Sequence, residues 1–188
     1  MRRCAGLRGL RRIFRVVRPE YHFVPVVRAD YPLISYWLRQ PHIGGWWGAP
    51  EHEIALIEKD FGQGKTDMRM VWYRGHAFAY AQDWDVGQED APHYAHLPRG
   101  SRGLDTFLGD PAYLGQGHAA RYLRVRAQCL IAAGAPCVAV DPDPANVRAV
   151  ATYKKAGFAG DLIALCQDGD PVQVMTFQGG KASGRTET

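Results

Sequence analysis

One short segment of the sequence carries the chemistry of a phosphate-binding loop. Leu114-Gly115-Gln116-Gly117-His118-Ala119 places two glycines and an alanine where a helix is expected to begin. The first N–H groups of a helix have no partners within it, and the helix dipole adds positive potential there. Because small residues let this backbone approach a ligand closely, the loop suits a pyrophosphate. A glycine-rich turn before an ordinary helix explains the same residues equally well, since short glycine motifs often occur by chance.

Polar side chains on the following helix extend this candidate site. Asn146, Ala149 and Tyr153 share one side of the helix, because they are three, four and seven residues apart. Asn146 could hydrogen-bond an elongated ligand, or it could cap the first turn of its own helix. Tyr153 could protonate a leaving group held close to its phenol, or it could be a core aromatic residue with a satisfied hydroxyl.

Two carboxylates lie on expected strands. Asp105 falls in the strand expected over residues 101–107, where its side chain and that of Leu104 face opposite sides of the sheet. A carboxylate there could take a proton from an amine, directly or through water, or it could satisfy backbone donors in a turn. Asp141 ends the apolar run 136–141 and could bind an amine or cap the next helix.

Alternating strands and helices are expected to hold these residues. A helix is predicted over about residues 117–133 by an apolar face that consists of Leu123, Ala127, Leu130 and Ile131. After a buried strand at 136–141, a second helix is predicted to begin near Pro144 or Ala145 and to end with Gly157 as its C-cap. This strand–helix–strand–helix series predicts an α/β domain.

The remaining elements are predicted from periodicity and turn residues. Pro25 indicates an edge position for a strand at 22–28, and Asp30 is the expected N-cap of a helix that ends near Arg39. A second helix is expected at 50–61, and the apolar stripes of the two helices contain Leu33, Ile34, Trp37, Leu38, Ile54, Leu56, Ile57 and Phe61. A hairpin is expected from 67–73 and 77–84, and two final strands from 158–166 and 171–177.

Two tryptophans stand between glycines in the loop 41–48. Trp46 and Trp47 would be costly to expose together. They either pack as a lid over the core or form a wall against which a flat or ring-shaped molecule rests.

Acidic residues gather in loops near the expected site. The polar loop 85–99 contains Asp85, Glu89 and Asp90, and Asp168 lies in the final turn. Each of these carboxylates taken alone is most simply a solvated surface charge, but together they would attract a polycation. The acidic residues of the helix at 50–61, which are Glu51, Glu53, Glu58 and Asp60, are assigned to its solvated face.

The composition predicts one globular domain with a basic N-terminal arm. The 188 residues are 46% hydrophobic and 22% charged, and no apolar stretch approaches the length of a membrane span. Seven of the 23 basic residues lie within residues 1–18, so the rest of the chain carries 16 basic and 19 acidic residues. We expect the arm, residues 1–20, to be disordered or an extension without a role. Nucleic-acid binding or a transit peptide are the alternatives.

The domain itself is predicted to span residues 21–178, followed by a disordered polar tail at 179–188. Four scattered cysteines lack CxxC spacing, which argues against a metal site or a disulfide framework. Reduced thiols in a cytoplasmic protein are the expectation.

The loop at 114–119 and the segment DPDPANVRAVATYKKAGF together resemble the cofactor-binding half of the GNAT superfamily of acyl-CoA-dependent N-acetyltransferases. The family loop is commonly Gln/Arg-x-x-Gly-x-Gly/Ala. Here Leu114 stands at the Gln/Arg position, Gly117 at the glycine and Ala119 at the last position. Leu114 departs from the pattern, which removes one side-chain contact but leaves the backbone loop.

A narrower resemblance rests on four motifs that occur in order. It is to the aminoglycoside 6′-N-acetyltransferases with an HI-x-x-WWG segment and an RGID-type strand, and it covers roughly Tyr31 to Phe177. The motifs are His42-Ile43-Gly44-Gly45-Trp46-Trp47-Gly48, Tyr80-Ala81-Gln82, Arg102-Gly103-Leu104-Asp105 and Asp141-Pro142.

The resemblance implies a fold and a reaction. It implies a mixed, mostly antiparallel sheet of seven strands with about four helices, splayed open between the fourth and fifth strands, with acetyl-CoA in the gap. It also implies acetyl transfer from acetyl-CoA to a primary amine without a metal. We therefore expect Asp105 to be the base and Tyr153 the acid that protonates the departing thiolate.

The expected binding residues follow from the same resemblance. Acetyl-CoA would contact Thr106, Phe107, Leu108, Leu114, Gly115, Gln116, Gly117, His118, Ala119, Asn146, Ala149 and Tyr153. The acceptor would contact Trp46, Trp47, Asp90, Asp105, Asp141 and Asp168. The expected acceptor is an aminoglycoside or another small polyamine, and the protein is expected to be a monomer or homodimer that binds neither membrane nor nucleic acid.

Three alternatives remain open at this stage. The acceptor could be an amine of siderophore assembly or of the lysine or hydroxylysine type, or it could be a protein amine. The domain could also bind acyl-CoA as a sensor without turnover, although the presence of both Asp105 and Tyr153 favours an enzyme.

Overall fold

The computed structural model describes residues 20–179. The predicted basic arm and the predicted polar tail therefore lie outside the described residues, except for Glu20 and Gly179. Among the helices of the described range, none combines the length and the apolar character needed to cross a membrane.

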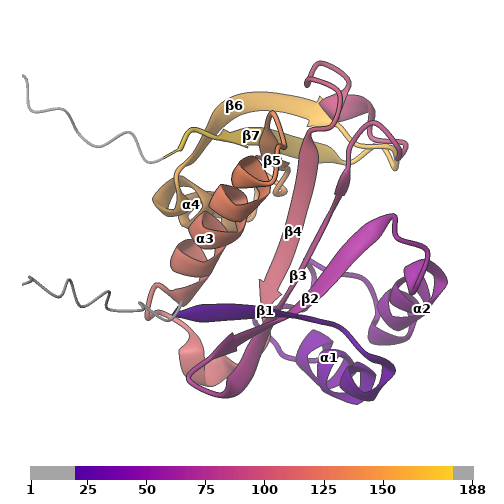
Figure 1. The fold of residues 1–188 in the computed structure, drawn as a ribbon, viewed down its shortest axis with the longest axis vertical. Coiled ribbons are helices and arrows are strands. Elements are labelled where there is room, and N and C mark those ends of the chain that lie inside the picture. The colour runs from indigo at the N-terminus through magenta and orange to yellow at the C-terminus, as the bar shows by residue number, and fades with distance from the viewer. Residues whose placement is uncertain (1–19, 180–188) are drawn as a thin grey trace, which may run out of the picture.

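The described part of the chain contains one sheet of seven strands, in the spatial order β1-β2-β3-β4-β5-β7-β6 (Figure 1). All neighbouring strands are antiparallel except β4 and β5, which are parallel. This arrangement confirms the predicted α/β fold with a mixed, mostly antiparallel sheet, and it places Pro25 on an edge strand. The strands are β1 (Tyr21–Pro25), β2 (Thr66–Tyr73), β3 (His76–Asp85), β4 (Arg102–Leu108), β5 (Val138–Val140), β6 (Phe158–Leu165) and β7 (Pro171–Phe177).

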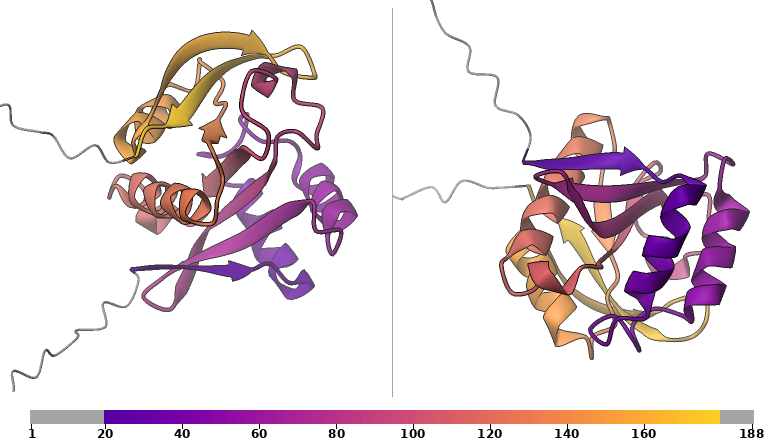
Figure 2. Two further views of the ribbon diagram at one scale, coloured as in Figure 1. Left: turned by 45° about the horizontal axis from the view of Figure 1, so that its top comes forward. Right: turned by 90° about the horizontal axis from the view of Figure 1, so that it is seen from below.

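Four α-helices cover the sheet within residues 20–179. The helices α1 (Tyr31–Leu38) and α2 (Pro50–Asp60) lie on one face, and α3 (His118–Ala132) and α4 (Val147–Ala156) lie on the other (Figures 1 and 2). Short 3-10 turns are η1 (Arg28–Asp30), η2 (Pro92–Tyr94) and η3 (Pro111–Tyr113). The two helix pairs therefore enclose the sheet from both sides.

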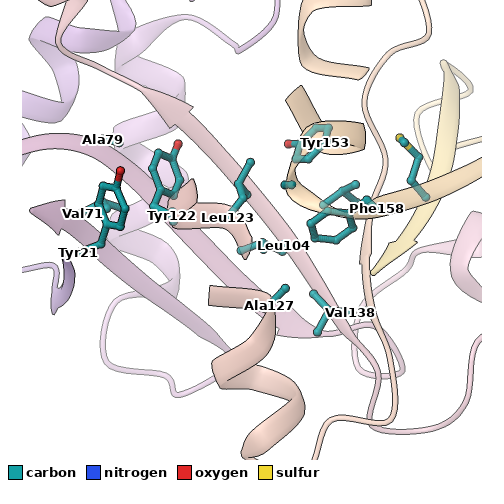
Figure 3. Packing of buried hydrophobic residues seen from close by; sticks show 14 of the residues in the cluster. Tyr21, Val71, Ala79, Leu104, Tyr122, Leu123, Ala127, Val138, Tyr153 and Phe158 are labelled. Atoms are coloured by element: carbon teal, nitrogen blue, oxygen red, sulfur yellow. The ribbon is translucent and has the colours of Figure 1, made fainter. Parts of the chain in front are cut away.

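Alternation along the strands separates two buried cores. On β4, Leu104 packs with Tyr122 and Leu123 of α3 in the core beneath α3 and α4 (Figure 3). Phe107 instead packs in the core beneath α1 and α2, which also contains Trp37. Because successive side chains of a strand point to opposite faces, Asp105 shares the Phe107 side, as predicted from its position beside Leu104.

The sheet opens between β4 and β5. These two strands pair only at Arg102 with Val138 and at Gly103 with Ala139. Beyond Gly103, the rest of β4 has no strand partner on this side among the described residues. The splayed sheet that the resemblance implied is therefore present, and its gap leaves the main chain of β4 available to a ligand.

The start of α4 differs from the prediction. The helix begins at Val147 rather than near Pro144 or Ala145, because the preceding residues form a turn. In that turn the Ala145 N–H donates to Oδ1 of Asp143 at 2.7 Å. Oδ1 of Asn146 then caps the helix by accepting from the Ala149 N–H at 3.0 Å. The predicted C-cap is present, since Gly157 has a φ of 105°.

Three predicted core residues are more exposed than expected. Leu33, Leu56 and Ile131 keep 37%, 43% and 40% of their surface accessible. The helix stripes that face the sheet are narrower than the sequence pattern indicated. On α3, Tyr122 takes the fully buried position next to Leu123.

Candidate active site

The gap between β4 and β5 holds a cavity of about 350 Å³, here called the cofactor cleft. Its walls come from the end of β4, the loop before α3, one side of α4 and the loop 41–48 with Trp46 and Trp47, here called the tryptophan loop. The predicted cofactor-binding residues that line it are Thr106, Phe107, Leu108, Leu114, Gly115, Gly117, His118, Ala119, Asn146, Ala149 and Tyr153. Gln116 does not line it, because its side-chain amide turns back to donate to the Ala112 carbonyl at 2.6 Å.

The loop that precedes α3 takes its shape from two glycines. Gly115 and Gly117 have φ values of 74° and 75°, a conformation that residues with a side chain rarely adopt. Gly117 is also the N-cap of α3 and has no side chain with which to cap the helix. The first N–H groups of α3 are therefore left for a ligand, as a phosphate site requires.

His118 contributes main chain rather than imidazole to this loop. Its side chain is only 4% exposed and lies in an aromatic cluster, with Nδ1 2.9 Å from the hydroxyl oxygen of Tyr21. Burial, followed by the charge of Arg121, lowers the pKa of His118. The predicted cofactor contact of His118 can thus come only from its backbone at the helix start.

The α4 side of the cleft carries Asn146, Ala149 and Tyr153, the three residues predicted to share a helix side. Asn146 caps its helix through Oδ1, so a ligand contact would use its amide nitrogen. The Tyr153 ring packs edge-on against Phe158, with ring centres 5.8 Å apart (Figure 3). Burial, followed by the charge of Asp105, raises the pKa of Tyr153, so its phenol is protonated and able to donate.

A second cavity of about 390 Å³ adjoins the cleft and is here called the acidic cavity. Four carboxylates line it: Glu53, Asp105, Asp141 and Asp143. The two cavities share the residues Trp46, Trp47, Thr106, Asn146, Ala149 and Tyr153. A molecule in the acidic cavity would therefore meet one in the cofactor cleft beside β4 and Tyr153.

Asp105 lines the acidic cavity next to Thr106, which lines both cavities. The amide nitrogen of Gln82 donates to its Oδ2 at 3.3 Å, and the amide oxygen of Gln82 accepts from the Tyr80 hydroxyl at 2.8 Å. Burial and then the negative charges of Asp141 and Glu53 raise the pKa of Asp105 to about 8, against the opposing effect of the Gln82 hydrogen bond. A carboxylate with a pKa near neutrality is suited to accept and release a proton.

Glu53 is a site residue that the sequence analysis assigned to solvent. It lies in the first turn of α2 and accepts from the Gly48 N–H at 2.9 Å. A Cβ atom at Gly48 would lie 2.3 Å from Oε1 of Glu53, so the glycine makes this approach possible. Its position five residues after the last glycine of the WWG motif was the only available signal, because helical periodicity alone makes Glu53 look like its exposed neighbours.

The tryptophan loop is tied to both sides of the gap. Nε2 of His42 lies 2.8 Å from the Leu108 carbonyl oxygen, and the Arg148 guanidinium donates to the His42 carbonyl at 2.6 Å. Trp47 packs edge-on against Phe107 with ring centres 4.9 Å apart, whereas Trp46 is 44% exposed. Both indoles line both cavities, so the loop has features of a packed lid and of a wall.

Two predicted acceptor residues lie elsewhere. Asp90 and Asp168 are exposed, and neither lines the cofactor cleft or the acidic cavity. Asp90 follows the turn at Asp85–Gln88, and Asp168 lies in the turn that joins β6 to β7. Their acidic character was visible in the sequence, but their distance from the cavities was not. No group of three or more metal-ligating side chains occurs in the described range.

Comparisons with known proteins match this geometry. A family model described as an acetyltransferase (GNAT) domain matches residues 26–162. An aminoglycoside N(6′)-acetyltransferase type 1 of Klebsiella pneumoniae is 26% identical over 155 residues, which cover 78% of this chain and 77% of the relative. A kanamycin resistance protein of Rhizobium radiobacter is 31% identical over 77 residues, which cover 40% of this chain and 71% of that protein.

Solved structures give the same result. AAC(6′)-Ib in complex with paromomycin and acetyl-CoA superposes with a TM-score of 0.76 at 25% identity, covering 90% of this chain and 99% of that one. AAC(6′)-Ib in complex with coenzyme A gives a TM-score of 0.75 at 26% identity, covering 89% and 99%.

Proposed function

The chain belongs to the GNAT acetyltransferase family, and from that premise we propose that it moves an acetyl group from acetyl-CoA to the 6′-amine of an aminoglycoside. The observation that carries the proposal is the acidic cavity beside the cofactor cleft, with four carboxylates on its wall. An aminoglycoside is a polycation whose ammonium groups would meet these carboxylates. The likeness to AAC(6′)-Ib, which was solved with an aminoglycoside and acetyl-CoA, supports the same acceptor.

Acetyl-CoA would occupy the cofactor cleft. Its pyrophosphate would lie at the start of α3, where Gly115 and Gly117 let the backbone approach. The amide nitrogen of Asn146 would hydrogen-bond the pantetheine arm. The unpaired side of β4, over Thr106 to Leu108, would bind the thioester carbonyl through its N–H groups and stabilise the negative charge of the tetrahedral intermediate.

Acetyl transfer then requires the acceptor nitrogen to lose two protons and the thiolate to gain one. Asp105 takes a proton from the acceptor ammonium, and the free amine attacks the thioester carbon to form a tetrahedral intermediate. The intermediate collapses as the C–S bond breaks, and Tyr153 gives its proton to the departing thiolate. The nitrogen releases its second proton to solvent, and the Tyr153 phenolate takes up a proton from solvent to restore the enzyme. No cysteine lies in the loop at 114–119 or on β4, so we propose direct attack in an ordered reaction, with acetyl-CoA bound first.

Binding of the acceptor would itself turn Asp105 into a base. In the empty site, the charges of Asp141 and Glu53 help raise the pKa of Asp105 to about 8. Ammonium groups bound at those two carboxylates would offset their charges and lower the pKa of Asp105 again. Asp105 would thus become a carboxylate when a polycation is in place to be deprotonated.

The cellular setting follows from the co-substrate. We infer a cytoplasmic enzyme, because acetyl-CoA is made and used there. The described cysteines Cys129, Cys137 and Cys166 are free thiols, which is compatible with a reducing compartment.

A matched pair of drugs tests the acceptor and its position. Neomycin and paromomycin differ in carrying an amine or a hydroxyl group at the 6′ carbon. We expect thiol release from acetyl-CoA with neomycin and with kanamycin, little with paromomycin, and a 6′-acetamide in the product by NMR. Equal release with paromomycin would contradict transfer to the 6′-amine.

The same assay separates the other functions. Release only with an N-hydroxylysine-type or lysine-type amine would keep the fold and the chemistry but replace the acceptor. Tight acetyl-CoA binding without release in the presence of any of these amines would favour a sensor that binds acyl-CoA without turnover.

A further inference from the structure

The loop between β3 and β4 places two aromatic residues behind the acidic cavity. The composition of residues 85–99 predicts a polar loop, but the turn η2 within it buries His93 and Tyr94, which are 6% and 1% exposed. Tyr94 packs with Val86, Ala139 and Val174, beside the end of β5. Asp141 follows β5 and lines the acidic cavity. The turn η2 therefore lies behind Asp141, on the side away from the cavity.

The imidazole of His93 approaches the carboxylate of Asp141. Nε2 of His93 lies 2.9 Å from Oδ2 of Asp141, a distance typical of a hydrogen bond, although the pair is not fully aligned in this conformation. The side chain of Asp141 keeps 20% of its surface exposed, whereas that of His93 keeps only 3%. A small rotation of either group would complete the bond.

The surroundings of Nδ1, the second ring nitrogen of His93, indicate which protonation state of the imidazole fits this site. Nδ1 is buried without a hydrogen-bond partner among residues 20–179. The neighbouring Tyr94 phenol also faces Asp141, since burial and then the charge of Asp141 raise the pKa of Tyr94. The two rings are in contact, with centres 4.1 Å apart. The neutral tautomer with its proton on Nε2 donates toward Asp141 and leaves only an acceptor unpaired, while an imidazolium would leave a buried donor unpaired.

A histidine at this place anchors a carboxylate without cancelling its charge. Elsewhere in the described range, Asp83 lies between the guanidinium groups of Arg102 and Arg126, which neutralise it. The ion-pair partner of Asp141 in that range is His93 and no arginine or lysine. An aspartate whose negative charge is not offset by a neighbouring cation binds an ammonium group more strongly.

We propose that His93 is a positioning residue for the acceptor: it holds one carboxylate oxygen of Asp141 and leaves the other for an ammonium group of the substrate. This proposal rests on the proposed function, because it assumes that a polycation enters the acidic cavity. His93 itself touches neither the cofactor cleft nor the acidic cavity.

Steady-state kinetics of two variants tests the proposal. His93→Phe keeps the buried ring but removes the donor, and we expect it to raise the KM for kanamycin about tenfold with little change in the KM for acetyl-CoA. His93→Gln restores a neutral N–H donor near the Nε2 position, and its KM should return to within about twofold of the natural value. His96→Gln, an exposed histidine on the same loop, is the control.

The comparison between the variants decides the outcome. A KM for kanamycin that is unchanged in His93→Phe, or a His93→Gln variant no better than His93→Phe, would overturn the proposal. In an Asp141→Asn background, adding His93→Phe should have no further effect on that KM, because the carboxylate that it holds is gone. An undiminished second effect would also overturn it.

A spectroscopic measurement keeps the inference separate from the acceptor assignment. In the natural chain with 15N-labelled histidine, long-range 1H–15N correlation should show the His93 proton on Nε2, and its signal should shift in Asp141→Asn. If no aminoglycoside is acetylated, the proposed function fails, and this spectrum still judges the contact. A proton on Nδ1, or a signal insensitive to Asp141→Asn, would overturn the positioning role.

Discussion

The cofactor cleft and the acidic cavity meet at β4 but are built in different ways. The cleft is lined mainly by residues 106–123 and 146–155, together with four residues of the loop 41–48. The acidic cavity takes its four carboxylates from α2, from β4 and from the segment after β5. Most of the cleft thus comes from two long segments of the sequence, whereas each carboxylate-bearing part of the acidic cavity comes from a different, distant segment.

The two regions would have different tasks. The cleft would bind acetyl-CoA, and the acidic cavity would select the amine. A pyrophosphate and a thioester can be bound by backbone N–H groups, which any sequence of suitable shape provides. Recognition of several ammonium groups requires charged side chains at fixed distances. Substitutions in the cleft should therefore change the use of acetyl-CoA, and substitutions in the acidic cavity should change the use of the amine.

Asp105 lines the acidic cavity beside Thr106, which lines both cavities, and it should show the largest effect. Asp105→Asn keeps the hydrogen bond with Gln82 but cannot accept a proton, so kcat should fall by about 10²–10⁴-fold. The KM for acetyl-CoA should stay within about twofold. Asp90→Asn, which removes an exposed carboxylate outside both cavities, should be nearly silent. A kcat close to the natural value in Asp105→Asn would mean that another group takes the proton.

The pH dependence checks the same residue. Because the pKa of Asp105 is raised to about 8, kcat/KM should fall as the pH falls below about 8, and Asp105→Asn should lose this dependence. A raised carboxylate pKa also means that the folded state binds more protons than the unfolded chain between about pH 4 and 8. The free energy of unfolding should therefore decrease as the pH rises through this window, less steeply in the Asn variant.

Tyr153 tests the chemistry on the cleft side. Tyr153→Phe keeps the ring contact with Phe158 but removes the proton donor for the thiolate, so kcat should fall by about 10²-fold. Both KM values should change little. Tyr73→Phe, which removes the hydroxyl from another tyrosine packed against the core that lines neither cavity, is the control. A variant of Tyr153 with natural kcat would return this residue to a purely packing role.

Gly117 tests the backbone of the cleft. An alanine at a φ of 75° is strained by about 1–2 kcal/mol, and the relaxed loop would move the first N–H groups of α3 away from the phosphates. We expect Gly117→Ala to raise the KM for acetyl-CoA about tenfold and to leave the KM for the amine unchanged. Gly62 has a similar φ of 77° far from the cleft lining, so Gly62→Ala should reduce stability alone. Similar kinetics for the two variants would contradict the role of the loop.

Glu53 should show the smallest effect, and it tests the acidic cavity. Glu53→Gln keeps an acceptor for the Gly48 N–H but removes one negative charge, so the KM for kanamycin should rise about threefold. The KM for acetyl-CoA should not change. Glu51→Gln, an exposed residue in the same helix turn, is the matched control. An equal effect of both substitutions would show that only overall charge matters.

The sequence by itself determined the elements whose geometry is local. The glycines at 115 and 117, the cap at Asn146 and the αL residue Gly157 depend on neighbours within a few residues, and each lies where its residue type requires. The alternation of β4 placed Leu104 and Asp105 on opposite faces for the same reason. The residues predicted to bind the cofactor therefore line the cleft, apart from Gln116, but the sequence did not place His42, Ile43 or Arg148 there.

The acidic cavity was decided by the tertiary structure. Periodicity cannot tell Glu53 from the exposed acidic residues of its helix, and loop composition cannot tell Asp90 from a residue that reaches the cavity. The buried contact of His93 with Asp141 joins residues 48 positions apart in the sequence, so no local pattern predicts it. Which carboxylates converge depends on how α2, β4 and the η2 loop pack against one another, and packing is a property of the whole fold.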